Sequence, residues 1–304
     1  MTTIKTGRPS ATPGVMALYQ QGRVEQAWQL GRRALAEHPS DVDLLNLLGV
    51  IGWQLRQYQA AHGYLVKSLS LQPRQAGAYV NLGLVLQAVG RRGDALACYD
   101  RALALVDLPP ARLNKAACLI TMYRYREALD VLQSLLDRPD VDPQAALNAA
   151  VACRELDRLD DALTWYERVV QHQPNSADAL RQYGECLARA GRIDEGISQV
   201  ERALAIAPQS AMVWLALARI RSSNREHALA LEAFEKATEC GPDIVDAWIG
   251  LARELQRRGE YAKALEMANR AVAMGASDAA AWFCRASIRM DLRQFVAPEI
   301  FITS

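Results

Sequence analysis

Three asparagines recur along the chain at nearly constant intervals, with 33 residues from Asn81 to Asn114 and 34 from Asn114 to Asn148. Gln182 follows after a further 34 residues. A carboxamide side chain carries both a hydrogen-bond donor and an acceptor, as a peptide unit does. Amides repeated in this way indicate a surface that binds the backbone of an extended peptide without reading its sequence.

Five arginines fall on the same helical stripe as these amides further along the chain, and Asn46 lies on that stripe nearer the N-terminus. The arginines are Arg181, Arg189, Arg219, Arg253 and Arg257. Guanidinium groups bind carboxylates, so these residues indicate a groove for acidic side chains or for a free carboxylate. Nearby acidic residues partly offset the charge, which leaves open a solvated charged face as the alternative. For the asparagines, the alternatives to peptide binding are that they are solvated or that they bond the neighbouring copy of a sequence repeat, which is described below.

No motif for a catalytic or metal site is present. The chain lacks a nucleophile elbow, a G-x-x-x-x-G-K-[ST] loop, a G-x-G-x-x-G loop and an H-E-x-x-H pair. The six cysteines include no C-x-x-C pair, and the four histidines include no pair four residues apart. We interpret the cysteines as small buried residues in a reducing compartment. We therefore predict a binding module with no catalytic residues, metal or cofactor, rather than an enzyme.

Composition and charge narrow the class of partner. The 304 residues are 51% hydrophobic and 23% charged, and 35 basic side chains stand against 34 acidic ones. This balance argues against binding nucleic acid or a membrane surface through bulk charge. No apolar run approaches the roughly 18 residues of a spanning helix, and the N-terminal stretch MTTIKTGRPSATPG lacks the apolar part of a secretory signal. We expect a cytoplasmic protein whose partner is a protein or peptide.

The constant interval belongs to an internal repeat of 34 residues, once 33. The stretch YVNLGLVL at 79 returns as WLALARIR at 214, WIGLAREL at 248 and WFCRASIR at 282. We place repeats at 8–41, 42–75, 76–108, 109–142, 143–176, 177–210, 211–244 and 245–278, and a final helix at 279–295. Residues 1–7 are predicted to be a disordered segment and residues 296–304 a C-terminal tail.

Two positions of the repeat are almost always small. The eighth position reads Val15, Gly49, Gly83, Ala116, Ala150, Gly184, Ala218, Ala252, and the twentieth reads Ala27, Ala61, Ala95, Ala128, Ala162, Gly196, Ala230, Ala264. Small side chains let two helices approach closely, so each repeat is predicted to be a pair of helices packed through these positions. Gly90, Gly191 and Gly259 mark the turn between the two helices.

The repeat resembles the tetratricopeptide repeat, whose pattern is W-x2-L-G-x2-Y, then A-x3-F, then P. Tyr79, Leu82, Gly83, Ala95 and Tyr99 fill these places in one copy. The resemblance covers residues 8–295. It implies an all-α fold, a right-handed superhelical solenoid of antiparallel helix pairs, whose concave face is built from the first helix of each pair.

On that concave face, the resemblance places the second, fifth, sixth, ninth and thirteenth residues of each repeat. The candidate peptide-binding residues are therefore Asn46, Asn81, Asn114, Asn148, Gln182, Arg181, Arg189, Arg219, Arg253 and Arg257. Arrays similar to the superhelix of O-linked N-acetylglucosamine transferase use such an asparagine ladder. Trp214, Trp248 and Trp282 stand at the fourth position, which packs within the repeat in this family, so we expect them in the core.

We predict a protein–protein interaction scaffold that binds an extended peptide or partner segment in the concave groove. The alternative is the N-terminal substrate-docking arm of a larger transferase, because bacterial proteins of this look often precede a glycosyl- or sulfotransferase domain, which would lie beyond residue 304. The piece Glu299–Ser304 resembles a β-strand and leaves this open. The apolar residues of the last helix and tail also suggest a homodimer through the C-terminal helix, or docking of the tail onto the last repeat.

Overall fold

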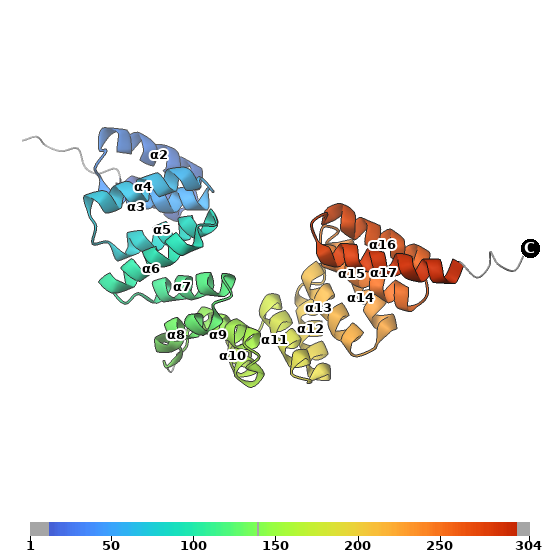
Figure 1. The fold of residues 1–304 in the computed structure, drawn as a ribbon. Helices are drawn as coiled ribbons and strands as arrows, with labels where there is room; N and C mark the ends of the chain where they lie inside the picture. Colours follow the sequence, from blue (N-terminus) through green and yellow to red (C-terminus); the bar gives the residue numbers. More distant parts are fainter. Residues whose placement is uncertain (1–11, 139, 297–304) are drawn as a thin grey trace, which may run out of the picture. The chain divides into compact units, whose positions relative to one another are not determined.

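The computed structural model describes residues 12–138 and 140–296, with the backbone alone for residues 294–296. This part of the chain forms seventeen α-helices and contains no strand (Figure 1). It divides into two compact units. Unit 1 ends at Leu156, and unit 2 begins at Asp157. The predicted segment 1–7 and residues 297–304 of the predicted tail, including its strand-like piece, lie outside the described residues.

In unit 1, the described residues form nine helices. They are α1 (Thr12–Gln20), α2 (Val24–Glu37), α3 (Val42–Gln54), α4 (Tyr58–Leu71), α5 (Ala76–Ala88), α6 (Arg92–Leu105), α7 (Pro109–Thr121), α8 (Tyr125–Leu136) and α9 (Pro143–Glu155).

In unit 2, the described residues form eight helices. They are α10 (Leu159–His172), α11 (Ala177–Arg189), α12 (Ile193–Ile206), α13 (Ala211–Ser223), α14 (His227–Cys240), α15 (Val245–Arg257), α16 (Tyr261–Met274) and α17 (Ala279–Val296). The division between the units falls inside the predicted repeat 143–176, between its two helices. The repeat boundaries themselves stay a prediction.

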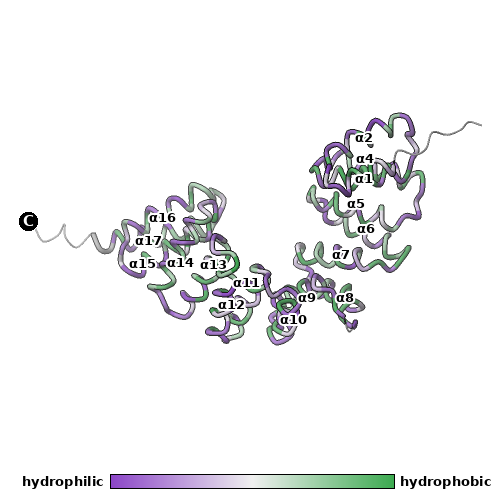
Figure 2. The backbone as a smooth tube through the Cα atoms, turned by 180° about the vertical axis from the view of Figure 1, so that it is seen from behind, coloured by the Kyte–Doolittle hydropathy of each residue, from purple (hydrophilic) through white to green (hydrophobic). Residues whose placement is uncertain are grey.

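The helices of each unit form two layers. Odd-numbered helices contact the next odd-numbered helix, as α5 does with α7 in unit 1 and α13 does with α15 in unit 2. Among the described residues, successive even-numbered helices make no comparable contact. The odd-numbered helices therefore form the more closely packed layer of each unit. Figure 2 shows hydrophilic and hydrophobic residues interspersed along the helices, as expected where one side of a helix packs and the other is solvated.

Small residues lie where the two helices of a pair touch. A Cβ atom added to Gly83 in α5 would lie 2.4 Å from Cε1 of Tyr99 in α6, and Tyr99 is fully buried. In the pair α11 and α12, a Cβ atom on Gly184 would lie 2.7 Å from the carbonyl oxygen of Gly196. The two backbones meet there with no room for a side chain. The predicted all-α solenoid of helix pairs is confirmed.

The turn inside each pair places the fifteenth residue of the repeat in the left-handed region of backbone space. Four of these residues are glycines, among them Gly90 with a φ of +80°. The other four, with φ between 59° and 63°, are Arg56, Tyr123, Asp157 and Arg225. Non-glycine residues rarely adopt this conformation because Cβ crowds the following carbonyl oxygen. The turn is thus imposed by the packing of the helices, with or without a glycine.

Trp214, Trp248 and Trp282 each form the same kind of hydrogen bond but differ in burial. Each donates its indole N–H to the carbonyl oxygen six residues earlier, at 2.9 Å for Trp214 and Trp248 and 2.8 Å for Trp282. Trp248 is 9% exposed, whereas Trp282 is 44% exposed. The expectation of a core position is wrong for Trp282, because no helix of the described part packs over the outer side of α17. None of the described helices has the length and apolarity needed to cross a bilayer.

Candidate functional site

The asparagines at the sixth position of the repeat lie on neighbouring odd-numbered helices of unit 1. Asn81 lies in α5, Asn114 in α7 and Asn148 in α9, and these helices contact one another in that order. Asn81 and Asn114 are half-buried. Their side chains form no hydrogen bond with any residue that the structure describes. Both amides therefore keep their donor and acceptor groups unused by the described residues.

Asn148 differs from the other two, because its hydrogen bonds are made within the protein. It is 7% exposed. Its Nδ2 donates to the carbonyl oxygen of Leu113 in α7 at 3.5 Å, and its Oδ1 accepts from Gln144 at 3.2 Å. This residue joins two successive repeats, which is one of the alternatives that the sequence left open.

Asn46 is also engaged within the protein, by the last residue of its own repeat. Its Nδ2 donates to Oε1 of Gln75 at 2.6 Å, and Gln75 in turn donates to the carbonyl oxygen of Gln72 at 2.7 Å. The Oδ1 atom of Asn46 is buried and has no hydrogen-bond partner among the described residues. Unit 1 therefore has two candidate amides without a hydrogen bond among the described residues, Asn81 and Asn114, and two that are bonded within the protein, Asn46 and Asn148.

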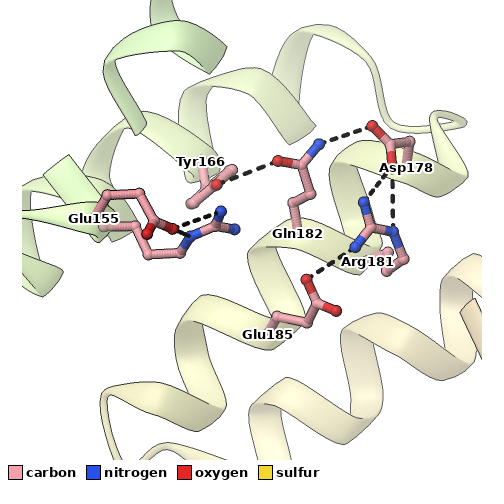
Figure 3. Close-up of polar contacts among 7 residues, drawn as sticks. Glu155, Tyr166, Asp178, Arg181, Gln182 and Glu185 are labelled. Atoms are coloured by element: carbon pink, nitrogen blue, oxygen red, sulfur yellow. Dashed lines mark hydrogen bonds and ion pairs between the residues drawn. The ribbon is translucent and has the colours of Figure 1, made fainter. Parts of the chain in front are cut away.

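In unit 2, the side chains of α11 are bound to one another (Figure 3). Arg181 lies between two carboxylates, at 2.6 Å from Asp178 and 2.9 Å from Glu185. Gln182 donates to Asp178 at 2.7 Å and accepts from the hydroxyl group of Tyr166 at 3.4 Å. Both predicted site residues are thus already neutralised or hydrogen-bonded. Arg189 extends instead toward Asp157, at 3.1 Å.

The other three candidate arginines meet at one cavity of about 320 Å³ in unit 2. The odd-numbered helices α13, α15 and α17 supply most of its wall, together with Phe234 of α14. Its polar lining residues are Arg219, Ser222, Ser223, Asp246, Arg253, Glu254 and Arg257. Sequence reasoning placed Arg219, Arg253 and Arg257 on one face, and the structure brings them to the same cavity.

A buried carboxylate forms the floor of this cavity. Glu254 is 1% exposed. Its carboxylate accepts a hydrogen bond from Oγ of Ser222 at 2.5 Å, lies 3.0 Å from Nδ1 of His227 and contacts the guanidinium group of Arg257. Buried carboxylates need such partners, because leaving one unpaired in the interior is costly. Arg257 is therefore held by the protein itself.

The remaining two arginines differ in how far they are neutralised. Arg219 is paired with Asp246 at 2.7 Å across α13 and α15. Arg253 is exposed and forms no ion pair with a carboxylate of the described residues. Burial raises the pKa of the neighbouring Cys284 thiol, and the charge of Arg253 opposes that shift only in part. Of the three arginines that line the cavity, Arg253 is the one without a carboxylate partner among the described residues.

Sequence reasoning missed Glu254, Ser222 and His227. One signal was available for Glu254, which occupies the tenth position of its repeat. In six of the other repeats and in the final helix, this position carries a buried residue without charge: Ile51, Val85, Cys118, Ala152, Cys186, Ile220 and Ile288. In the first repeat it is Ala17, which is exposed but also uncharged. A carboxylate at a position of the core predicts a buried polar network. Its partners Ser222 and His227 could not be deduced, because they lie in a different repeat.

The cysteines and the other groups that could bind a metal ion are predicted to have no chemical role. All six cysteines are free, and five are buried. Burial raises the pKa of the thiols of Cys98 and Cys118, which disfavours the nucleophilic thiolate. Within the described part, no group of three or more histidine, cysteine or acidic side chains is placed to hold a metal ion.

Comparison with known families identifies the repeat. A model described as "Tetratricopeptide repeat protein 21 N-terminal ARM repeat" matches residues 90–295, more than half of the chain. A second model, described as "Tetratricopeptide repeat", matches residues 14–76. The chain belongs to the tetratricopeptide repeat family. The fold and the helix pairs described above are those of a tetratricopeptide repeat protein.

Individual relatives are distant. The "BBSome complex member BBS4" of Bos taurus is 23% identical over 159 residues, which is 52% of this chain and 31% of that protein. The "Cytochrome c-type biogenesis protein CycH" of Rhizobium meliloti (strain 1021) is 27% identical over 128 residues, 40% of this chain and 32% of that protein. The matched part of the chain thus spans about a third of the length of these relatives.

Among solved structures, the APC/C hetero-tetramer Cut9–Hcn1 is similar to this tetratricopeptide repeat protein. The TM-score is 0.67 at 17% sequence identity, and the likeness covers 83% of this chain and 50% of that one. At this identity the likeness concerns the fold alone.

Proposed function

We propose that this tetratricopeptide repeat protein is an interaction scaffold that binds an extended segment of a partner protein on its odd-numbered helices. The family and the fold support a scaffold, because an array of helix pairs presents a long continuous surface. Similarity to a member of the BBSome complex agrees with a role in an assembly. Each unit contributes its own binding surface to this proposal.

The observation that carries the proposal is the pair of open amides on α5 and α7. Packed helices lie about 8–10 Å apart, and an extended chain advances about 3.3 Å per residue. Asn81 and Asn114 would therefore meet peptide units about three residues apart. Each amide can donate to a peptide carbonyl oxygen and accept from a peptide N–H group, whatever the side chains of the ligand are.

The cavity of unit 2 adds a preference for acidic ligands. Arg257 is occupied by Glu254 and Arg219 by Asp246. Arg253 has no such partner among the described residues. A carboxylate that enters the cavity would gain a charge-assisted hydrogen bond from Arg253. The ligand carboxylate would also compete with Asp246 for Arg219, since both side chains of that ion pair are about half exposed.

Selection from a random peptide library on the full chain tests this function. We expect selected peptides to be extended and free of helical pattern, with an excess of Asp and Glu, and to lose affinity for the Asn81→Ala/Asn114→Ala variant. Asn269→Ala is the matched control, because Asn269 is exposed on the even-numbered helix α16. Peptides that bind the double variant and the control equally well would overturn the proposal. The interpretation as the docking arm of a transferase stays a prediction.

A further inference from the structure

One stripe of each odd-numbered helix is normally covered by the second helix of its own pair. The stripe consists of the fourth, eighth and twelfth residues of the repeat, which share one helical face. In α5 these are Tyr79, Gly83 and Gln87. The guanidinium group of Arg101 in α6 lies 5.9 Å from the ring centre of Tyr79, and Tyr99 reaches both Gly83 and Gln87.

In α17, the corresponding stripe is not covered by any helix of the described residues. Its residues are Trp282, Ala286 and Met290, and all three are exposed, Trp282 at 44% and Met290 at 60%. The described contacts of α17 are with α15 and α16, on its other side. Trp282 is nevertheless fixed as its buried counterpart Trp248 is, because both donate the indole N–H to a carbonyl oxygen six residues earlier. The indole ring of Trp282 is therefore held in one orientation while it is exposed.

Three arginines flank this open stripe. Arg285, Arg289 and Arg293 follow one another at intervals of four residues and line a hollow of about 250 Å³ together with Trp282, Ala286 and Met290. We refer to these six residues as the α17 arginine face. The hollow contains no carboxylate, and none of the three arginines is ion-paired within the described part of the chain. The guanidinium group of Arg285 lies over the Trp282 ring, at 4.1 Å from its centre.

The same positions in the preceding repeat are apolar. Leu251 and Leu255 in α15 correspond to Arg285 and Arg289, and both leucines are buried. The α17 arginine face therefore keeps the small residue and the aromatic residue that receive a second helix, and replaces the surrounding apolar residues with positive charge. A helix that fits this face must carry apolar residues on one stripe and carboxylates beside it.

We propose that the α17 arginine face binds an acidic amphipathic helix of a partner protein, in the place that a second helix occupies in the other repeats. Ala286 allows close approach of the incoming backbone, as Gly83 does in α5. Trp282 and Met290 supply apolar contact, and the three arginines select carboxylates. A second copy of this chain does not fit, because the symmetric contact would set two rows of arginines against each other. A purely solvated cap would not need an exposed tryptophan and methionine on the same stripe.

The test is a fluorescence-anisotropy titration of the full chain with a labelled helical probe peptide. The probe has about 16 residues, roughly 24 Å of helix, with leucines on one stripe and glutamates on both sides of it. A matched probe carries glutamine in place of every glutamate. The variants are Trp282→Ala and the triple Arg285→Gln/Arg289→Gln/Arg293→Gln. The triple Arg192→Gln/Arg202→Gln/Arg258→Gln removes the same charge elsewhere in unit 2, and circular dichroism establishes that each variant is folded.

We expect the acidic probe to bind the wild-type chain at least about 10-fold more tightly than the neutral probe, with the difference reduced by added salt. The α17 triple variant should weaken binding of the acidic probe about 10-fold or more and remove its salt dependence, whereas the control triple should change it little. Trp282→Ala should weaken both probes. Equal binding of the two probes, or equal effects of the two triple variants, would overturn the proposal. Binding to anionic lipid vesicles through the same arginines, without binding of the probe, would also overturn it in favour of a membrane surface.

Discussion

The carboxylate of Glu254 and the guanidinium group of Arg257 lie in contact one turn apart on α15, and Glu254 is the one buried charged side chain among the described residues. The contact decides how the cavity of unit 2 works. It holds Arg257 in place through a group that water does not reach, so Arg257 serves the structure of the cavity wall. The neighbouring Arg253 has no such partner among the described residues, which is why the proposed function assigns it to the ligand.

Removing this carboxylate should destabilise unit 2. Glu254→Ala deletes the acceptor shared by Ser222, His227 and Arg257, and we expect the free energy of unfolding to fall by about 1–3 kcal/mol. Glu266→Ala on α16 is the matched control, because its ion pair with Arg270 is exposed and should contribute at most about 1 kcal/mol. Urea unfolding followed by circular dichroism measures both. Equal stability of the two variants would show that the buried network contributes nothing beyond a surface pair.

The contact between Gly184 and Gly196 should tolerate no added side chain. Gly184→Ala places a Cβ atom against a backbone carbonyl oxygen, which cannot rotate away, so we expect a loss of about 1–3 kcal/mol from overpacking. Gly63→Ala in α4 has nothing within 4 Å of the new Cβ atom. Since alanine favours a helix over glycine, that control should gain about 0.5–1 kcal/mol. Thermal unfolding of the two variants should shift in opposite directions, and a shift of Gly184→Ala toward higher temperature would contradict the packing.

The left-handed turn residues without glycine offer a stabilising substitution. Arg56 is exposed and has a φ of +59°. The left-handed conformation costs a residue with a Cβ atom about 1–2 kcal/mol. Arg56→Gly removes this cost. Glycine is also more flexible in the unfolded chain, which offsets part of the gain, so the substitution should raise the free energy of unfolding by up to about 1 kcal/mol. Arg56→Val should lower it, because a β-branched side chain fits this conformation least well. Denaturant midpoints in the opposite order would argue against the assigned turn.

The buried thiols should react slowly. Burial raises the pKa of Cys98, Cys118 and Cys284, so less thiolate is present at about pH 8 than in an ordinary cysteine, whose pKa is about 8.5. Cys240 is the one cysteine that is not buried. Titration of the native chain with Ellman's reagent should show about one fast thiol, and six after denaturation. Mass spectrometry that finds Cys118 labelled as fast as Cys240 would contradict this burial.

The repeat predicted most of the fold because packing leaves a regular trace in the sequence. Small residues at the eighth position, such as Gly83 and Gly184, lie where the helices touch. The site was less predictable, because the sequence places residues on a face without showing whether they are already bonded. Asn114 and Asn148 occupy the same position of successive repeats, yet only Asn148 is buried against a backbone carbonyl.

Trp282 shows a second limit of sequence reasoning. Its position in the repeat is that of Trp248, and its indole hydrogen bond is the same. The two differ only in what covers them, which for Trp248 includes Arg270 of the following helix α16. Burial therefore depends on the next element of the array rather than on the residue itself.

The central claim is that extended partner segments bind on the odd-numbered helices, to amides on the surface of unit 1 and to Arg253 on the surface of unit 2. The most direct measurement is a titration of library-selected peptides, one for each surface, against the wild-type chain, Asn81→Ala/Asn114→Ala, Arg253→Gln and the control Asn269→Ala, at about 50 mM and 500 mM salt. Two lost hydrogen bonds of about 0.5–1.5 kcal/mol each should weaken binding about 5- to 100-fold in the double variant, at both salt concentrations. The loss in Arg253→Gln should be clear at low salt and small at high salt. A double variant that binds as tightly as Asn269→Ala would contradict the claim and place the partner elsewhere on the molecule.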